Sequence, residues 1–316
     1  IINHCGEYIK KVSSPTRIAV VTDSNVHALY SQSVITSLKQ SGFIVSEFVF
    51  NAGETSKNFR TIEAIYSHLA DNNITRKDMI LALGGGVTGD MAGFAAATYL
   101  RGIEFVQVPT SLLAQVDSSV GGKTGYDIPQ GKNLVGAFWQ PSVVLIDPDT
   151  LSTLPERYLN DGMAEVIKYG CIKSAGLFRL LKKGRDELDI ENIIHRCVSI
   201  KRDVVQKDEK ESGERKLLNF GHTIGHALEK IYEYKKLSHG EAVAIGMVMM
   251  TKASERDGYS PKGTANKIAE LCEMYNLPTH DDSEVRDIAF AAQSDKKSSG
   301  HNIDVVILKS IGDATV

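Results

Sequence analysis

Strong net charge and long apolar runs are both absent from this sequence of 316 residues. Its 36 Lys and Arg residues nearly balance its 39 Asp and Glu residues, for a net charge of −3. Because this balance gives no positive field over the whole molecule, we expect neither nucleic acid nor an anionic membrane surface as a partner. The longest apolar run, residues 242–250, is too short for a membrane span, which needs roughly 20 residues.

Cysteine is also scarce, and its four positions are far apart. Cys5, Cys171, Cys197 and Cys272 form no CxxC motif, and no positively charged start leads into an apolar segment as in a secretory signal. The pattern argues against a disulfide framework and predicts reduced thiols in a cytoplasmic protein.

The residues that are present fall into two parts. In residues 1–148, apolar β-branched runs alternate with helical patterns, which is typical of a mainly parallel sheet covered on both faces. Residues 149–316 read mostly as helices. We therefore predict an α/β domain over 1–148, a helical domain over 149–316, and a ligand site in the cleft between them. Strands are expected at residues 17–23, 43–50, 79–83, 103–109 and 143–147, and helices at 25–40, 58–70, 90–100, 161–172, 190–207, 219–234 and 240–256.

A glycine-rich segment, residues 84–90, directly follows an expected strand and opens a helix. Gly84, Gly86 and Gly89 satisfy GxGxxG, and such a turn lets backbone N–H groups approach a phosphate at a helix N-terminus. The same segment also fits a tight structural turn, because it lies in the third strand–helix unit rather than the first. Asp23 and Asn25, after the first strand, are placed either to meet a ribose or to cap a helix.

A set of possible metal ligands lies in the second half. His222 and His226 are four residues apart, so a helix would present both on one face. His239 starts a later helix, and Glu165 is a carboxylate inside an apolar helical stretch. Nitrogen and oxygen ligands without cysteine suit a catalytic zinc. A hydrogen-bonded surface pair is the alternative for the two histidines.

Several cationic and amide groups lie near glycines. They occur in residues 121–124 and 131–133, which we expect in a long loop, at Lys201, in residues 215–219, and in residues 295–297. Each alone fits a solvated charged surface. Together they indicate a substrate with more than one anionic group.

Taken together, these motifs resemble those of the 3-dehydroquinate synthases of the shikimate pathway. The resemblance extends from about residue 17 to about residue 310, and residues 109–124 are its most specific part. The matching blocks are residues 84–90, 109–124, 131–134, 164–168, 218–226 and 239–241. Typical members are longer at both ends, so a first strand and a last helix are expected to be missing here.

The resemblance implies a Rossmann-like NAD-binding domain followed by an all-helical domain, usually in a homodimer. It implies conversion of a sugar-acid phosphate, 3-deoxy-D-arabino-heptulosonate 7-phosphate (DAHP), into 3-dehydroquinate and phosphate. In the family, NAD transiently oxidises the C5 hydroxyl, phosphate is eliminated, the hydride returns, and an intramolecular aldol step closes the ring. Zn²⁺ or Co²⁺ polarises the oxygen at the oxidised carbon.

Family roles transfer by motif to individual residues of this chain. The zinc ligands match Glu165, His222 and His239, and the proton acceptor matches Glu211. His226 matches a catalytic position near the substrate rather than a ligand. The remaining catalytic matches are Lys201, Arg215 and Asn219 for the carboxylate, Lys123, Asn133 and one of Lys296 or Lys297 (we favour Lys297) for the phosphate, Asp117 and Lys168 for the ring hydroxyls, and Arg101 for the neighbouring subunit's site.

The NAD contacts implied by the resemblance lie in the first half and at the start of the second. They are Asp23, Asn25, Glu54, Lys57, Gly86, Val87, Thr88, Gly89, Asp90, Thr110, Ser111, Lys123, Lys132, Thr150, Leu151, Ser152 and Thr153.

Three other functions share parts of this pattern. A 2-deoxy-scyllo-inosose synthase uses the same NAD and metal chemistry on a substrate without a carboxylate, which leaves Lys201 little to do. A metal-dependent polyol dehydrogenase shares the two-domain plan but needs fewer anion contacts. An NAD-binding sensor would not need the acid–base residues.

Overall fold

The computed structural model describes residues 1–295 and 304–316, and the chain separates into two units, Ile1–Leu154 and Pro155–Val316. The first unit is built on a five-stranded sheet in the order β2-β1-β3-β4-β7, and every neighbouring pair is parallel. Its strands are β1 (Arg17–Asp23), β2 (Ile44–Phe50), β3 (Met79–Gly84), β4 (Glu104–Pro109) and β7 (Val143–Val144).

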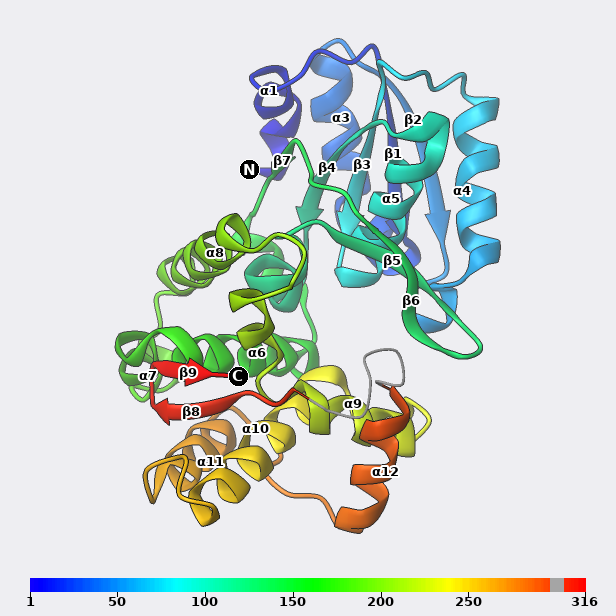
Figure 1. Ribbon diagram of the computed structural model, residues 1–316. Coiled ribbons are helices and arrows are strands. Elements are labelled where there is room, and N and C mark those ends of the chain that lie inside the picture. Colours follow the sequence, from blue (N-terminus) through cyan, green and yellow to red (C-terminus); the bar gives the residue numbers. More distant parts are fainter. Residues whose placement is uncertain (296–303) are drawn as a thin grey trace. The chain divides into compact units, whose positions relative to one another are not determined.

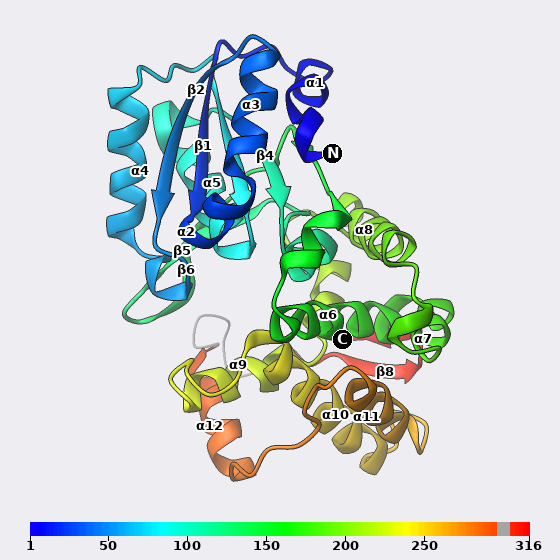
Figure 2. The same ribbon diagram turned by 180° about the vertical axis from the view of Figure 1, so that it is seen from behind.

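Helices cover both faces of this sheet, as the alternating pattern predicted. The helices of the first unit are α1 (Cys5–Lys10), α2 (Ser24–Val26), α3 (Gln32–Gln40), α4 (Phe59–Asp71) and α5 (Gly86–Thr98). Alternate residues of β1 enter separate cores: Ala19 and Val21 pack with α4 and α5, whereas Ile18 and Val20 pack with α1 and α3. Figure 1 shows the sheet with α5 in front, and Figure 2 shows it with α3 in front.

The strand order creates a switch point between β1 and β3. From β1 the chain moves outward to β2 and then returns to the other side of β1 as β3. In open parallel sheets, ligands bind at the carboxyl ends of the strands where the order reverses. Here those ends carry Asp23 and the glycines that begin at Gly84.

The loop expected around residues 121–133 is instead an antiparallel hairpin of β5 (Lys123–Ile128) and β6 (Gly131–Phe138). Glycine hides the strand signal, because Gly125 and Gly136 face each other across the ladder. A Cβ on Gly136 would lie 2.3 Å from the Thr124 carbonyl oxygen, so the close approach of the two strands needs glycine there.

The second unit is helical, with one exception. Its helices are α6 (Glu156–Lys173), α7 (Ala175–Leu181), α8 (Ile190–Lys207), α9 (His222–Ile231), α10 (His239–Arg256), α11 (Thr264–Met274) and α12 (Val285–Asp295). The exception, which the sequence did not predict, is a two-stranded antiparallel sheet of β8 (Ile307–Ser310) and β9 (Asp313–Thr315). Both strands are short, and a three- or four-residue run carries too little alternation to be recognised.

Helix α10 is the centre of the second unit. Its residues from Ala242 to Val248 are all buried, which explains why the longest apolar run of the sequence lies here. Helices α6, α9 and α11 pack against it. A Cβ on Gly246 would lie 2.0 Å from the Gly221 carbonyl oxygen, so the backbones of α10 and of the start of α9 touch. This contact fixes two helices whose first residues are histidines.

In residues 1–295 and 304–316, no helix is both long and apolar enough to cross a membrane. The remaining helical segments are short. The short 3₁₀-helical segments are Ile2–His4, Glu54–Ser56, Tyr99–Arg101, Pro148–Thr153, Arg185–Glu187 and Glu214–Asn219. Two wider π-type turns are His27–Ser31 and Ala114–Ser118.

Candidate active site

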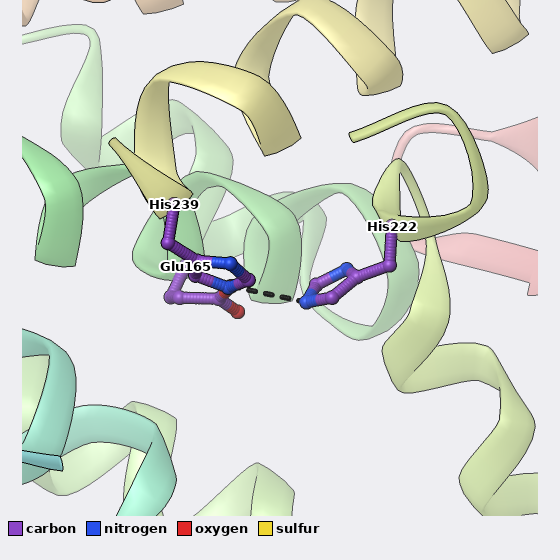
Figure 3. Close-up of side chains that lie close together, drawn as sticks. All are labelled: Glu165, His222 and His239. Carbon is purple, nitrogen blue, oxygen red and sulfur yellow. Dashed lines mark ion pairs between the residues drawn. The ribbon is translucent and has the colours of Figure 1, made fainter. Parts of the chain in front are cut away.

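Glu165, His222 and His239 converge in the second unit from three different helices (Figure 3). Glu165 lies in the middle of α6 and is fully buried, whereas His222 and His239 are the first residues of α9 and α10. One ligand atom from each residue lies within 4.8 Å of the others. Residues far apart in the sequence are therefore brought to one point.

The distances within this cluster suit a metal ion. Glu165 Oε1 lies 3.3 Å from Nε2 of His222 and 3.3 Å from Nε2 of His239. Two ligands bound about 2.1 Å from one tetrahedral ion are about 3.4 Å apart, so the spacing matches a zinc shell. A set of two histidines and one carboxylate is also a ligand set of catalytic zinc sites. The residues present fit a divalent metal.

The orientation of the His222 ring follows from its second nitrogen. Nδ1 lies 3.1 Å from the Phe220 carbonyl oxygen, which can only accept a hydrogen bond. Nδ1 therefore carries the proton, and the lone pair of Nε2 faces Glu165. Burial lowers the pKa of His222, and the nearby Lys168 lowers it further. The neutral form that a metal needs is thus favoured.

The charge of Glu165 is balanced inside the protein. Burial raises the pKa of this carboxyl, but the Lys168 ammonium and His222 outweigh that effect and hold it well below its usual range. Lys168 is itself buried and forms an ion pair with Glu165 Oε2 from the next turn of α6. Burial also lowers the pKa of His239, yet the nearby carboxylates of Glu165 and Glu229 raise it to about 10.

The third histidine lies beside this cluster. The ring centroid of His226 is 5.4 Å from that of His222 and 6.1 Å from that of His239. Its ligand atom also groups with Glu229 and His239. The three histidines thus form one group, and the spacing of four residues on a helix is the signal that predicted two of them together.

A second group of predicted residues lies in the segment between α8 and α9. Asn219 Nδ2 donates to Glu211 Oε1 at 2.5 Å, and Glu211 has a left-handed backbone with φ of +62°. Arg215 is buried and donates to the Glu209 carbonyl oxygen. Lys201 is buried on α8, which packs against this segment.

Asp208 holds the shape of that segment and was not predicted. Its carboxylate accepts hydrogen bonds from the backbone N–H groups of Ser212 at 2.9 Å, Gly213 at 2.7 Å and Arg215 at 3.0 Å. Desolvation raises the pKa of Asp208, but these hydrogen bonds together outweigh it and lower the pKa to about 2. Since Asx-type turns recur throughout loops, the sequence alone did not distinguish this one.

In the first unit, predicted cofactor residues gather at the switch point. Asp23 accepts hydrogen bonds from the N–H groups of Asn25 at 2.9 Å and Val26 at 3.1 Å, so it caps α2. The Thr88 hydroxyl, from the glycine segment, lies 3.4 Å from Asp23 Oδ2. Thr110 N–H donates to the Gly84 carbonyl at 3.0 Å, which places the end of β4 beside the same turn.

The glycine segment forms the first turn of α5, which starts at Gly86 rather than near residue 90 as predicted. Within the described chain, no side chain caps this helix at Gly85, and the N–H groups of its first turn suit an anion. Added Cβ atoms on Gly85 and Gly86 would lie 3.3 Å from Ser111 Oγ and 3.2 Å from Ser118 Oγ. This narrow cradle fits the pyrophosphate of a dinucleotide.

Other predicted cofactor residues form a polar network next to α5. Lys57 is buried and donates to Asp90 Oδ2 at 2.6 Å and to Asn133 Oδ1 at 2.5 Å. Lys132 lies 3.5 Å from Glu54 Oε1. The hairpin therefore brings residues predicted for the phosphate end of the substrate against residues predicted for NAD.

The remaining predicted residues are dispersed among other elements. Lys123 is exposed at the start of β5, Asp117 lies in the turn Ala114–Ser118, and Arg101 is exposed. Leu151, Ser152 and Thr153 lie with buried Thr150 in the turn Pro148–Thr153. Gln115, which was not predicted, holds this turn by donating to Thr150 Oγ1 at 3.0 Å. Lys296 and Lys297 lie outside the described residues.

Comparison with known proteins assigns both units to one family. Residues 47–161 match the family model 3-dehydroquinate synthase N-terminal, and residues 162–298 match 3-dehydroquinate synthase C-terminal. The 3-dehydroquinate synthase of Clostridium acetobutylicum is 50% identical over 100% of this chain and 90% of its own length.

Two solved synthase structures share this fold. A 2-epi-5-epi-valiolone synthase from Streptomyces hygroscopicus, solved with NAD⁺ and Zn²⁺, has a TM-score of 0.87 and 29% identity over 95% of this chain and 86% of its own. A 2-deoxy-scyllo-inosose synthase, solved with carbaglucose-6-phosphate, NAD⁺ and Co²⁺, has a TM-score of 0.86 and 26% identity over 100% of this chain and 89% of its own.

Proposed function

The chain belongs to the 3-dehydroquinate synthase family, and we propose that it converts DAHP into 3-dehydroquinate and phosphate with NAD⁺ and a divalent metal. The observation that carries the proposal is the convergence of Glu165, His222 and His239 at zinc-like spacing in a chain 50% identical to a curated member. Zn²⁺ is the first candidate and Co²⁺ the second, because the two cyclase structures hold these ions.

Each unit has a part in this proposal. Residues 1–148 form the NAD-binding part, supported by the switch point at Asp23 and Gly84 and by the uncapped start of α5. Residues 149–316 bind metal and substrate. When bound, NAD⁺ supplies a hydride acceptor and the metal supplies a Lewis acid at the substrate oxygen.

The chain's own residues bind the substrate and move its protons. Lys201, Arg215 and Asn219 hold the carboxylate, and the buried positions of the two cations favour fixed orientations. Glu211 accepts a proton, and its hydrogen bond from Asn219 fixes Oε1. His226 acts beside the metal ligands. The phosphate is held by Lys123, Asn133 and Lys297, and the ring hydroxyls by Asp117 and Lys168.

We also propose a homodimer in which Arg101 reaches the partner's site. The backbone supports a special role for this segment, because Leu100 and Arg101 have φ values of +51° and +69°. Consecutive non-glycine residues in the left-handed region are strained, and such strain concentrates at functional sites. A cytoplasmic location is proposed because all four cysteines are buried free thiols.

The direct test is phosphate release from DAHP. The protein is incubated with DAHP, NAD⁺ and Zn²⁺, and inorganic phosphate and 3-dehydroquinate are measured together. We expect both in equal amounts. A hexose 6-phosphate, which lacks the carboxylate, should release none. Phosphate release from the hexose 6-phosphate but not from DAHP would contradict the proposal and favour the inosose synthase reaction.

A further inference from the structure

Asp161 lies one helical turn before Glu165 on α6, and both are buried. Residues four apart on a helix share a face, so the two carboxylates point to the same side of α6. Glu165 contacts the two histidines, whereas Asp161 contacts the backbone that carries one of them. No role was assigned to Asp161 from the sequence.

The contacts of Asp161 bracket His239. The hydroxyl of Ser238 donates to Asp161 Oδ1, and the N–H of Gly240 donates to the same oxygen at 3.1 Å. These donors belong to the residues immediately before and after His239. One oxygen atom on α6 therefore fixes both sides of the histidine backbone.

Close packing reinforces these hydrogen bonds. A Cβ on Gly240 would lie 2.5 Å from Asp161 Cα and 2.6 Å from the Asp161 carbonyl oxygen. Such distances do not occur for real side chains, so the first turn of α10 touches α6 only because residue 240 is glycine. The hydrogen bonds to Asp161 and this contact act on the same turn.

One turn before Asp161 on α6, Arg157 makes a further contact between α6 and the start of α10. Its guanidinium donates to Glu241 through Nε at 3.2 Å and Nη2 at 2.8 Å. Glu241 in turn accepts the N–H of Ser238 at 2.8 Å in a capping box at the start of α10. The first turn of α10 is therefore in contact with three successive turns of α6, through Arg157, Asp161 and Glu165.

We propose that Asp161 is a positioning residue of the metal centre, which holds the backbone of His239 in register with Glu165 on the same helix. This inference rests on the proposed function, in which both residues are metal ligands. Without the acceptor at Asp161, the start of α10 keeps the hydrogen bonds between Arg157 and Glu241 but loses the two that Ser238 and Gly240 donate to α6. His239 Nε2 then no longer stays 3.3 Å from Glu165 Oε1, and the ligand set is not preformed.

The test compares Asp161→Ala with Asp161→Asn in the full chain. Metal affinity is measured by competition between the protein and a chelating indicator for Zn²⁺, and the visible spectrum of the Co²⁺ form reports ligand geometry. We expect Asp161→Ala to bind Zn²⁺ roughly 10–100-fold more weakly, as for other outer partners of metal ligands. Asp161→Asn keeps an amide oxygen that accepts from Ser238 and Gly240, so it should bind nearly as the parent does, with the parent's Co²⁺ spectrum.

A second pair of variants tests the proposal independently of whether Asp161→Ala folds. Ser238→Ala removes one hydrogen bond to Asp161 together with the cap of α10. Asp189→Ala removes the cap of α8, where Asp189 accepts from Asn192 N–H at 3.1 Å, and α8 carries none of the three proposed metal ligands. If Asp161 positions His239, Ser238→Ala weakens Zn²⁺ binding and Asp189→Ala does not, although both lower thermal stability.

Glu165→Gln separates this inference from the proposed function. If Glu165→Gln binds Zn²⁺ as tightly as the parent, the metal site itself is wrong and the inference falls with it. If Glu165→Gln loses Zn²⁺ while Asp161→Ala and Ser238→Ala keep the parent's affinity and Co²⁺ spectrum, only the positioning role is overturned.

Discussion

Lys57 Nζ donates to Asp90 Oδ2 over 2.6 Å and so ties the segment after β2 to the first turns of α5. The Lys57 side chain is only 5% exposed. Burial lowers its pKa, but Asp90 and Glu54 raise it more, so the pKa is raised above its usual value. Lys57 is thus charged inside the protein and depends on Asp90. Lys57 and Asp90, which we propose as NAD contacts, therefore also form an ion pair that stabilises the fold.

We predict that Lys57→Met lowers the free energy of unfolding by about 3 kcal/mol, because it leaves the Asp90 carboxylate without its buried partner. The double variant Lys57→Met/Asp90→Asn should regain part of this loss, since the Asp90 charge that Lys57 balanced is gone. Urea unfolding of both single variants and the double variant gives the coupling energy. Strictly additive effects would show that the ion pair contributes nothing.

Loss of a direct metal ligand should be more severe than loss of an outer partner. We predict that His222→Ala binds Zn²⁺ more than about 100-fold less tightly and loses activity. Its far-ultraviolet circular dichroism should stay unchanged, because the buried Met163 and Val166 of α6 still pack the unit. Metal retained after dialysis is measured by atomic emission.

The exposed His195 on α8 provides the matched control. His195→Ala should keep both metal and activity. A His222→Ala protein that retains one tightly bound ion per chain and turns over substrate would remove His222 from the ligand set.

Much of the fold was predictable because its signals are local. The strands β1 to β4 are β-branched or apolar runs, and the apolar run in α10 is central to the second unit. The glycine-rich hairpin β5–β6 was missed because Gly125 and Gly136 give it weak strand propensity. Its pairing depends on close backbone approach, which no single position reveals.

Some residues of the candidate site were likewise predictable from the sequence, and others were not. The spacing of His222 and His226 and the family motifs led to residues that the structure brings together. Asp161 and Gln115 were missed, because their backbone and side-chain partners are distant in sequence. The Asp161 carboxylate accepts a hydrogen bond from the N–H of Gly240, and such a distant partner produces no recognisable sequence pattern around residue 161.

Acid should weaken the protein partly through Asp78. Burial raises the pKa of this carboxyl, but it accepts hydrogen bonds from Thr75 N–H at 2.8 Å and Oγ1 at 2.7 Å and from Arg17 N–H at 2.7 Å, which lower the pKa overall. A carboxyl whose pKa is lower in the folded state than in the unfolded chain stabilises the fold above the unfolded value of about 3.9. That contribution is lost as the pH falls through the folded value.

We therefore predict that Asp78→Asn costs about 2 kcal/mol near neutral pH, and that this difference from the parent shrinks below about pH 4. Urea unfolding across a pH series measures it. Glu63→Gln removes a charge from an exposed position of α4 and should show no comparable change. A constant difference between Asp78→Asn and the parent down to pH 2 would contradict the role assigned to the Asp78 charge.

Sharing of Arg101 between subunits can be tested by complementation. Arg101→Asn keeps the left-handed backbone, which asparagine tolerates, but removes the guanidinium. We predict that Arg101→Asn and Lys201→Ala are each nearly inactive and that their mixed dimers regain part of the activity. In a mixed dimer one site combines an intact Lys201 with an intact Arg101 from the partner. Mixed dimers, verified by two affinity tags, that recover nothing would count against a shared site.

The fate of the hydride distinguishes the proposed cyclase from a dehydrogenase. A dehydrogenase releases reduced cofactor, so NADH accumulates one for one with product. Here Lys123, Lys201 and Arg215 are proposed to hold both anionic ends of the substrate, and this remote binding keeps the oxidised intermediate in place until the hydride returns. We predict that NAD⁺ is needed only in catalytic amounts and that phosphate exceeds NADH many-fold throughout the reaction. Absorbance at 340 nm and a phosphate assay on the same samples measure the two quantities. NADH rising in step with substrate loss, with phosphate retained on the product, would favour a dehydrogenase instead.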